Sequence, residues 1–116
     1  MQCVSLLFLV LLFSLSLSLR VLTFNTWLSG SKVHDGLAKI AKHIKIVNPD
    51  IVSLQEIESQ EIVVNLTELL GPEWSGVCHC KLNTAIVTKH KIENGSYAQT
   101  KFNAMGVKID LDDGDK

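Results

Sequence analysis

The chain has 116 residues, of which 47% are hydrophobic and 20% are charged, and its formal net charge is −1. This length accommodates no more than one domain. The near-neutral charge excludes the strongly basic surface of many nucleic-acid-binding domains, although nucleic acid held through a metal ion stays open as a substrate.

The N-terminal segment carries no charged side chain up to Leu19 and consists mostly of Leu, Val, Phe and Ser. Its apolar part, residues 4–19, is shorter than the roughly 20 residues that a helix needs to cross a bilayer. Ser16 and Ser18 have the small-x-small spacing of a signal-peptidase site, so residues 1–18 are interpreted as a secretory signal peptide and residues 19–116 as the domain. The alternatives are an uncleaved anchor and a buried core helix. Cleavage is favoured because Arg20 already belongs to the first predicted strand, which an uncut membrane helix would hold against the lipid headgroups.

Two strand-like runs, residues 20–24 and 50–54, flank one amphipathic helix. Asn25 follows the first run, and Gln55 and Glu56 follow the second. Two parallel strands joined by a helix form a βαβ unit with a right-handed crossover. We therefore expect Asn25 and Glu56 to lie together at the carboxyl ends of adjacent strands, where α/β sheets bind ligands.

The helix between these strands is predicted to begin near Asp35, a candidate N-cap, and to end before Pro49. Its apolar positions recur with helical spacing and should face the core; they are Leu37, Ile40, Ala41, Ile44 and Val47. Three lysines lie on the opposite side: Lys39, Lys42 and Lys45. A solvated outer face is the preferred interpretation of these lysines, and a phosphate or membrane patch is the alternative.

A second helix is predicted over residues 60–70, with Ser59 as its N-cap and Glu61 in its first turn. The Gly71-Pro72 pair ends it. The expected buried stripe of this helix consists of Ile62, Val63, Leu66, Leu69 and Leu70.

The rest of the chain is predicted to form strands at residues 74–80, 84–89, 97–102 and 104–111. No helix separates these strands, so we expect them to be largely antiparallel. Turns are expected at residues 89–91 and 93–95, and Asn94-Gly95 predicts a hairpin. The last residues, 110–116, are interpreted as a hairpin turn rather than a calcium loop, because they lack one residue of the loop spacing and a downstream Glu. With no returning strand, the sheet is expected to be truncated.

Glu56 is the sharpest candidate for chemistry. A carboxylate that follows a buried strand must be paired or bind a cation. A site with few protein ligands suits Mg²⁺, because magnesium keeps several waters and takes substrate phosphate as a ligand. Mn²⁺ could substitute for it. Asn25 can add an amide oxygen to the metal shell or donate a hydrogen bond to a phosphoryl oxygen. The alternative is a solvated Glu56 with Asn25 capping a turn.

Two segments, LTFNTW at residues 22–27 and NPDIVSLQE at residues 48–56, resemble the endonuclease/exonuclease/phosphatase family with its deoxyribonuclease-I-like fold. Residues 84–92 are similar to a later strand of that family, and residues 104–111 with Gly114 to the strand and turn that follow. The resemblance runs from Arg20 to the C-terminus. It implies an α/β fold, namely the N-terminal part of a four-layer α/β/β/α sandwich in which a βαβ unit precedes mostly antiparallel strands.

The resemblance implies that Glu56 is the magnesium ligand and that Asn25 is a metal-shell or phosphate-positioning residue. It also implies that Gln55 does not contact the metal but supports the residues that do. Water attacks phosphorus in this family while the metal acts as Lewis acid and template. The family's Asp-x-Asn segment and Asp-His pair would lie beyond residue 116. Trp27, in the loop at residues 26–36, is a candidate for the substrate rim or for packing.

None of the four histidines matches a family motif, and each is interpreted as a surface or packing residue: His34, His43, His79 and His90. Cys78 and Cys80 are too close in sequence to pair comfortably with each other. They cannot close a tetrahedral zinc site with one histidine of the same strand, because successive side chains of a strand point to alternate faces.

These features together imply a secreted, magnesium-dependent phosphoric-ester hydrolase, either a phosphodiesterase or endonuclease, or a phosphatase or sphingomyelinase-like enzyme. Its substrate would be nucleic acid, phospholipid or inositol phosphate, with no stable protein partner evident and no transmembrane span after signal cleavage. Asn65 and Asn94 begin sequons and are candidate glycosylation sites of a secreted protein. The alternative is a catalytically inactive, truncated product that acts at most as a binding or structural fragment.

Overall fold

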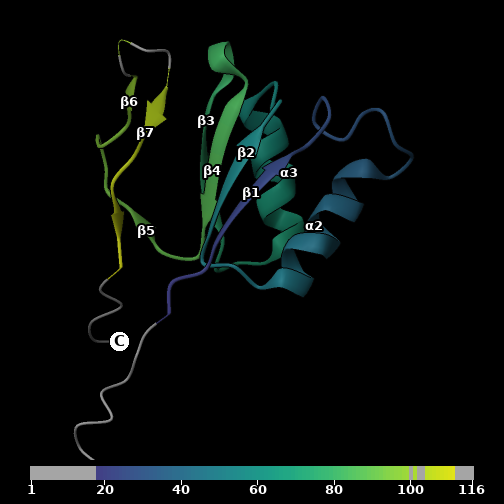
Figure 1. Ribbon diagram of the computed structural model, residues 1–116, viewed down its shortest axis with the longest axis horizontal. Coiled ribbons are helices and arrows are strands. Elements are labelled where there is room, and N and C mark those ends of the chain that lie inside the picture. Colours follow the sequence, from purple (N-terminus) through teal and green to yellow (C-terminus); the bar gives the residue numbers. More distant parts are fainter. Residues whose placement is uncertain (1–17, 100, 102–103, 112–116) are drawn as a thin grey trace, which may run out of the picture.

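The structure, a computed structural model, describes residues 18–99, 101 and 104–111. The described part of the chain is a small α/β domain with one mixed sheet, two helices and a set of short C-terminal strands (Figure 1). Residues 1–17 of the expected signal peptide and the expected turn after residue 111 lie outside the described residues.

The main sheet has four strands in the order β1-β2-β4-β3. Their bounds are Val21–Asn25 for β1, Ile51–Gln55 for β2, Ser75–His79 for β3 and Thr84–Thr88 for β4. β1 and β2 are parallel, whereas β4 pairs antiparallel with both β2 and β3. This arrangement confirms the predicted βαβ unit and the antiparallel strands that follow it. Strands β1 and β2 each begin and end one residue later than predicted, so Asn25 and Gln55 are their last residues.

Helices α2 (Gly36–Val47) and α3 (Gln60–Leu70) cover one face of this sheet (Figure 1). The core lies between the helices and the sheet, and every second residue of β2 enters it. Its buried members are Ile40, Ala41, Ile44, Val52, Leu54, Ile57, Val63, Leu66, Leu70, Trp74, Ala85 and Val87. Neither helix of the described chain is long and apolar enough to span a membrane.

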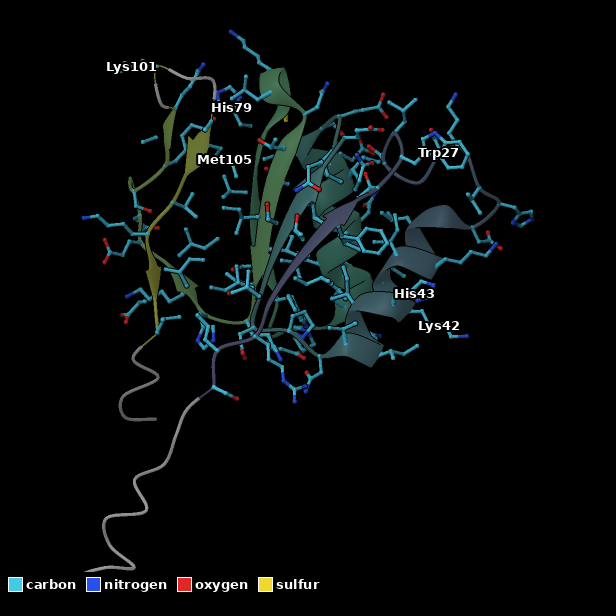
Figure 2. The ribbon with its side chains drawn as sticks, viewed as in Figure 1. Trp27, Lys42, His43, His79, Lys101 and Met105 are labelled. Atoms are coloured by element: carbon cyan, nitrogen blue, oxygen red, sulfur yellow. The ribbon has the colours of Figure 1, made fainter. Side chains whose placement is uncertain are left out.

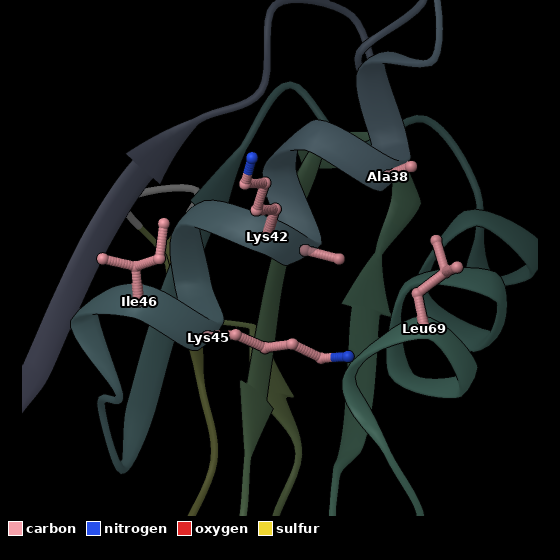
Figure 3. Close-up of a pocket in the computed structure, with 6 residues that line it drawn as sticks. Ala38, Lys42, Lys45, Ile46 and Leu69 are labelled. Carbon is pink, nitrogen blue, oxygen red and sulfur yellow. The ribbon is translucent and has the colours of Figure 1, made fainter.

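Two residues of the predicted helix stripes are not buried, so the prediction was wrong for them. Val47 is 46% exposed, because it is the last residue of α2. Leu69 is 42% exposed and borders a shallow groove of about 410 Å³ between the helices, where Lys42 and Lys45 of α2 also lie (Figure 3). Helical periodicity gives the direction of a side chain but not whether a neighbour covers it.

The predicted N-caps differ in outcome. The Ser59 hydroxyl accepts a hydrogen bond from the Ile62 backbone N–H at 3.3 Å, which confirms this cap. Asp35 occupies the cap position of α2, but its φ is 54° and its side chain makes no cap bond. Its carboxylate instead lies 2.8 Å from Nδ1 of His34. The tight approach of the loop explains this geometry, because a side chain at Gly36 would collide with the backbone of Gly30.

The short strands after β4 form a C-terminal ribbon of two nested antiparallel pairs. β5 (Lys91–Ile92) pairs with β8 (Ile109–Asp110), and β6 (Ala98–Gln99) pairs with β7 (Met105–Gly106). In Figure 1 the ribbon lies beside the sheet on the side away from the helices, and the Nε2 atom of His79 lies 2.9 Å from Oε1 of Gln99.

The predicted hairpin at Asn94-Gly95 is wrong, although a turn is present there. Ser96 N–H donates to the Glu93 carbonyl at 3.2 Å, and Gly95 has a φ of 73°. Both sides of this turn bond the same residue of the opposite arm. The backbone carbonyl of Lys108 accepts the Glu93 N–H, and the backbone N–H of Lys108 donates to the Ser96 hydroxyl. The turn is therefore an outward bulge within one arm and does not reverse the ribbon.

Asp50 anchors the end of the sheet opposite Asn25 and Glu56. Its carboxylate accepts the Arg20 backbone N–H at 2.7 Å, and Lys89 Nζ and His90 Nε2 lie 4.0 Å and 3.7 Å from its other oxygen. The Arg20 hydrogen bond is the main cause that lowers the pKa of Asp50 from its ordinary value of 3.8; partial burial opposes it, and the charges of Lys89 and His90 assist.

We expect Asp50→Asn to remove part of the pH dependence of stability. A carboxyl group whose pKa is lowered in the folded state stabilises it fully above its unfolded-state pKa, and this contribution is lost as the pH falls through the folded-state pKa. The difference in unfolding free energy between wild type and Asp50→Asn should be constant above about pH 5 and shrink below about pH 4. Urea titrations across this range measure it, and a difference that does not shrink would contradict the anchor.

Candidate functional site

Asn25 and Glu56 meet at the carboxyl ends of β1 and β2. Asn25 and Gln55 are paired in the parallel register, and Glu56 is the next residue of the chain. The Asn25 side-chain Nδ2 donates to Oε1 of Glu56 at 3.1 Å. The structure thus brings together two residues that the βαβ topology predicted to be neighbours.

The second carboxylate oxygen of Glu56 is held by the backbone. Its Oε2 accepts the Leu28 N–H at 2.9 Å, so each carboxylate oxygen has one protein donor. Glu56 itself has a φ of 59°, which turns the chain sharply at the end of β2. A carboxylate offers about four acceptor sites, so two stay available for a cation or water.

The loop after β1 contains a left-handed turn. The φ values of Trp27, Leu28, Ser29 and Gly30 are 49°, 55°, 57° and 76°, and the Gly30 N–H donates to the Thr26 carbonyl at 2.8 Å. Left-handed backbone costs non-glycine residues about 1–2 kcal/mol each. Such strain is held by its surroundings and clusters at functional sites. Here it aims the Leu28 N–H at Glu56.

Two buried hydroxyl residues fasten this turn to the end of β2. Thr26 is 3% exposed, and its hydroxyl donates to the Gln55 carbonyl at 2.9 Å. Ser29 is 6% exposed; its N–H donates to the Glu56 carbonyl at 2.9 Å and its hydroxyl accepts the Glu58 N–H at 3.1 Å. Sequence reasoning missed both residues. The available signal was a Thr and a Ser just ahead of Gly30 in a polar loop.

The amide of Asn25 is oriented by bonds at both ends. Its Oδ1 accepts the Trp27 N–H at 2.9 Å, while its Nδ2 donates to Glu56. A flipped amide would place its NH₂ group against the Trp27 N–H and its oxygen against the Glu56 carboxylate, and both bonds would be lost. These two bonds use one Nδ2 hydrogen and one Oδ1 lone pair of Asn25, and the amide has one more of each.

Gln55 and Trp27 point away from the carboxylate. Gln55 Nε2 donates to the Thr23 hydroxyl at 3.1 Å and to the Ser53 hydroxyl at 3.3 Å, along the sheet face away from the helices. Its backbone carbonyl accepts the Thr26 N–H at 3.0 Å, which ties the end of β2 to the loop after β1. Trp27 is 61% exposed, and Figure 2 shows it on the loop beyond β1, so its indole does not belong to the core of the described residues.

The histidines take no part in the bonds around Glu56. His79 is buried and its ring lies 5.5 Å from that of Tyr97, centroid to centroid, while His90 lies beside Asp50. His34 and His43 are exposed. Across the described part of the chain, no three His, Cys, Asp or Glu side chains are grouped so that they could hold a metal ion together.

The remaining sequence-predicted sites are on the surface. Asn65 on α3 and Asn94 in the ribbon turn are both exposed, as a glycan requires.

At the rim, Glu56 supplies one hard carboxylate with free acceptor sites, which fits a magnesium ion that takes most of its ligands from water and substrate phosphate. The arrangement can hold such a cation next to an amide donor, Asn25.

We expect glycine to be preferred over alanine at position 27. Trp27→Gly should unfold with a free energy about 1 kcal/mol higher than Trp27→Ala, because alanine bears the cost of the left-handed backbone. Lys39, an exposed residue within α2, provides the matched control, where alanine should be the more stable by about 1 kcal/mol. Chemical denaturation compares the pairs, and the same order at both positions would contradict the left-handed turn.

Comparisons with known proteins place this chain beside one relative. No family model matches the chain, and no solved structure matches it. It is 45% identical over 101 residues to an uncharacterized protein of Caenorhabditis elegans, an alignment that covers 85% of this chain and 32% of that protein. The chain therefore spans about a third of the length of this curated relative.

Proposed function

We propose that the chain is the N-terminal portion of a secreted, magnesium-dependent phosphoric-ester hydrolase, of the phosphodiesterase or endonuclease type or of the phosphatase or sphingomyelinase-like type. The observation that carries this proposal is the bond of 3.1 Å between Asn25 and Glu56 at the carboxyl ends of two parallel strands. The same two segments carry the resemblance to the endonuclease/exonuclease/phosphatase family. A phosphate ester of nucleic acid, phospholipid or inositol would be the substrate.

The proposed complete fold is a four-layer α/β/β/α sandwich. A second sheet would pack on the face of the main sheet that the helices leave uncovered. Val21 on that face is 64% exposed, and Thr23 is exposed as well. The C-terminal ribbon already lies on this side, which supports its assignment as the start of the second sheet (Figure 1).

In the proposed site, each residue of the rim has its own task. Glu56 would hold the magnesium ion, which when bound neutralises the charge that develops on the phosphoryl group. The Leu28 N–H and the Asn25 amide each bond one carboxylate oxygen, which restricts the rotamers that the Glu56 side chain can adopt. The second Nδ2 hydrogen of Asn25 would hold a phosphoryl oxygen, and the exposed indole of Trp27 would line the rim.

A catalytically inactive binding or structural fragment is the second candidate. The observation that favours it is the lack, in the described residues, of a histidine bonded to the Asn25 and Glu56 pair. The sequence also contains no Asp-x-Asn segment. For the hydrolase candidate, the groups that activate water would have to come from outside these 116 residues.

The full-length protein should hydrolyse bis(4-nitrophenyl) phosphate in the presence of Mg²⁺ and lose this activity on chelation. We expect Glu56→Ala to lower kcat/KM by about 100-fold or more, as removal of a key charge-stabilising group does. Glu58→Ala is the matched control, since Glu58 is exposed and bonds Ser29 only through its backbone N–H; its activity should stay within about twofold, as exposed positions generally tolerate substitution.

Two results would contradict the proposal. Equal activity of Glu56→Ala and wild type would show that the site is wrong. A wild-type protein without magnesium-dependent hydrolysis would favour the inactive fragment.

Secretion has its own test. Intact-mass analysis of protein collected from the medium should give a chain that begins at Leu19, because a signal peptidase would cut after Ser18. A chain that keeps Met1 would contradict the signal peptide while leaving the hydrolase proposal standing.

A further inference from the structure

The thiols of Cys78 and Cys80 lie against each other at the end of β3. Their Sγ atoms are 2.6 Å apart, although the sequence spacing had argued against a pair. The strand ends at His79, and a short 3₁₀ helix, η1 (Cys80–Leu82), begins at once. The contact between the sulfurs therefore spans the end of the strand, with Cys78 on β3 and Cys80 in η1.

The backbone on both sides of the pair is fixed. Gln60 of α3 bonds the outer edge of β3, because its Oε1 accepts the Cys78 N–H at 2.9 Å and its Nε2 donates to the Gly76 carbonyl at 3.3 Å. On the other side, the Asn83 N–H donates to the Cys80 carbonyl at 3.2 Å. These bonds hold the backbone from which both sulfurs project.

His79 between the two cysteines serves the opposite face of the strand. Its Nε2 lies 2.9 Å from the Gln99 side chain and its ring lies against Tyr97. The imidazole thus belongs to the contact between the sheet and the C-terminal ribbon. What remains at the end of β3 is a dithiol, two soft nucleophiles without a third ligand from His79.

The surroundings of Cys78 favour its protonated form. Burial is the largest cause that raises the pKa of Cys78 to about 12, and the hydrogen bond and charge of Cys80 add to it. Cys78 is therefore protonated at neutral pH and can donate its S–H to the sulfur of Cys80.

We propose that Cys78 and Cys80 are a modification site that forms a reversible intrachain disulfide by exchange with a low-molecular-weight disulfide such as oxidised glutathione. The site is separate from the Asn25 and Glu56 pair, and it does not depend on the proposed hydrolase activity.

The reaction takes place in two balanced steps. The Cys80 thiolate attacks one sulfur of oxidised glutathione, which forms a mixed disulfide and releases one glutathione thiolate. Cys78 then loses its proton and attacks Sγ of Cys80, which closes the Cys78–Cys80 bond and releases the second glutathione. The protein loses two electrons and two protons, and one glutathione disulfide becomes two thiols.

The bond would close a turn that contacts the rim. The Asn83 carbonyl, three residues after Cys80, accepts the Ile57 N–H at 3.1 Å, and Ile57 directly follows Glu56. Oxidation would therefore constrain the backbone turn on which the residue after Glu56 is held.

The test incubates the reduced full-length protein with oxidised glutathione, natively and in urea, and blocks remaining thiols. Cleavage after Trp74 and Lys81 releases residues 75–81, a peptide with no other cysteine. In the native sample this peptide should have lost two hydrogen atoms and carry no glutathione. In urea a larger share of this peptide should carry glutathione, because the unfolded chain brings the two sulfurs into contact for a smaller fraction of the time.

Single substitutions supply the controls. Cys78→Ser leaves Cys80 without a partner, so its peptide should retain glutathione as a stable mixed disulfide under native conditions. Native wild-type peptide that stays fully reduced, or that keeps glutathione as Cys78→Ser does, would overturn the proposal. An equal yield of the internal disulfide in urea would overturn it too, since the fold would then contribute nothing.

Discussion

The parallel pairing of β1 with β2 is the interaction on which the rest of this domain depends. It places Asn25 within 3.1 Å of Glu56, a residue 31 positions further along the chain. Parallel strands need a crossover, and α2 supplies it by burying Ile40 and Ile44 against the sheet. A shift of the register by one residue would turn every side chain of β1 to the opposite face, and Asn25 would then point toward the helices.

The turn after β1 shows how a costly local conformation is kept. Its three non-glycine residues cost about 3–6 kcal/mol in left-handed backbone. At least six hydrogen bonds tie the turn to Asn25 and to the segment that includes Glu56, and at about 0.5–1.5 kcal/mol each their sum is of the same size. The turn and the Glu56 carboxylate therefore stabilise each other, and neither conformation is expected without the other.

The features that follow from local pattern were predictable from the sequence. The bounds of α3 and its Ser59 cap follow from periodicity and capping chemistry, and the meeting of Asn25 with Glu56 follows from topology. The left-handed turn was not predictable, because Trp27 and its neighbours do not favour left-handed backbone. They adopt it because it lets them form hydrogen bonds with the end of β2 and with Glu56. The contact between the sulfurs of Cys78 and Cys80 was not predicted for a related reason, because the strand ends between the two residues.

The Gln60 side chain on β3 has a consequence for the outline of the sheet. An edge strand presents unpaired N–H and C=O groups that can recruit another strand. Gln60 takes up one donor and one acceptor of β3, so that side is capped. In the described part of the chain, β1 is the other edge, with a neighbouring strand on one side only. The two edges of the sheet therefore differ in how open they are to pairing. A further strand from this or another chain would be added beside β1.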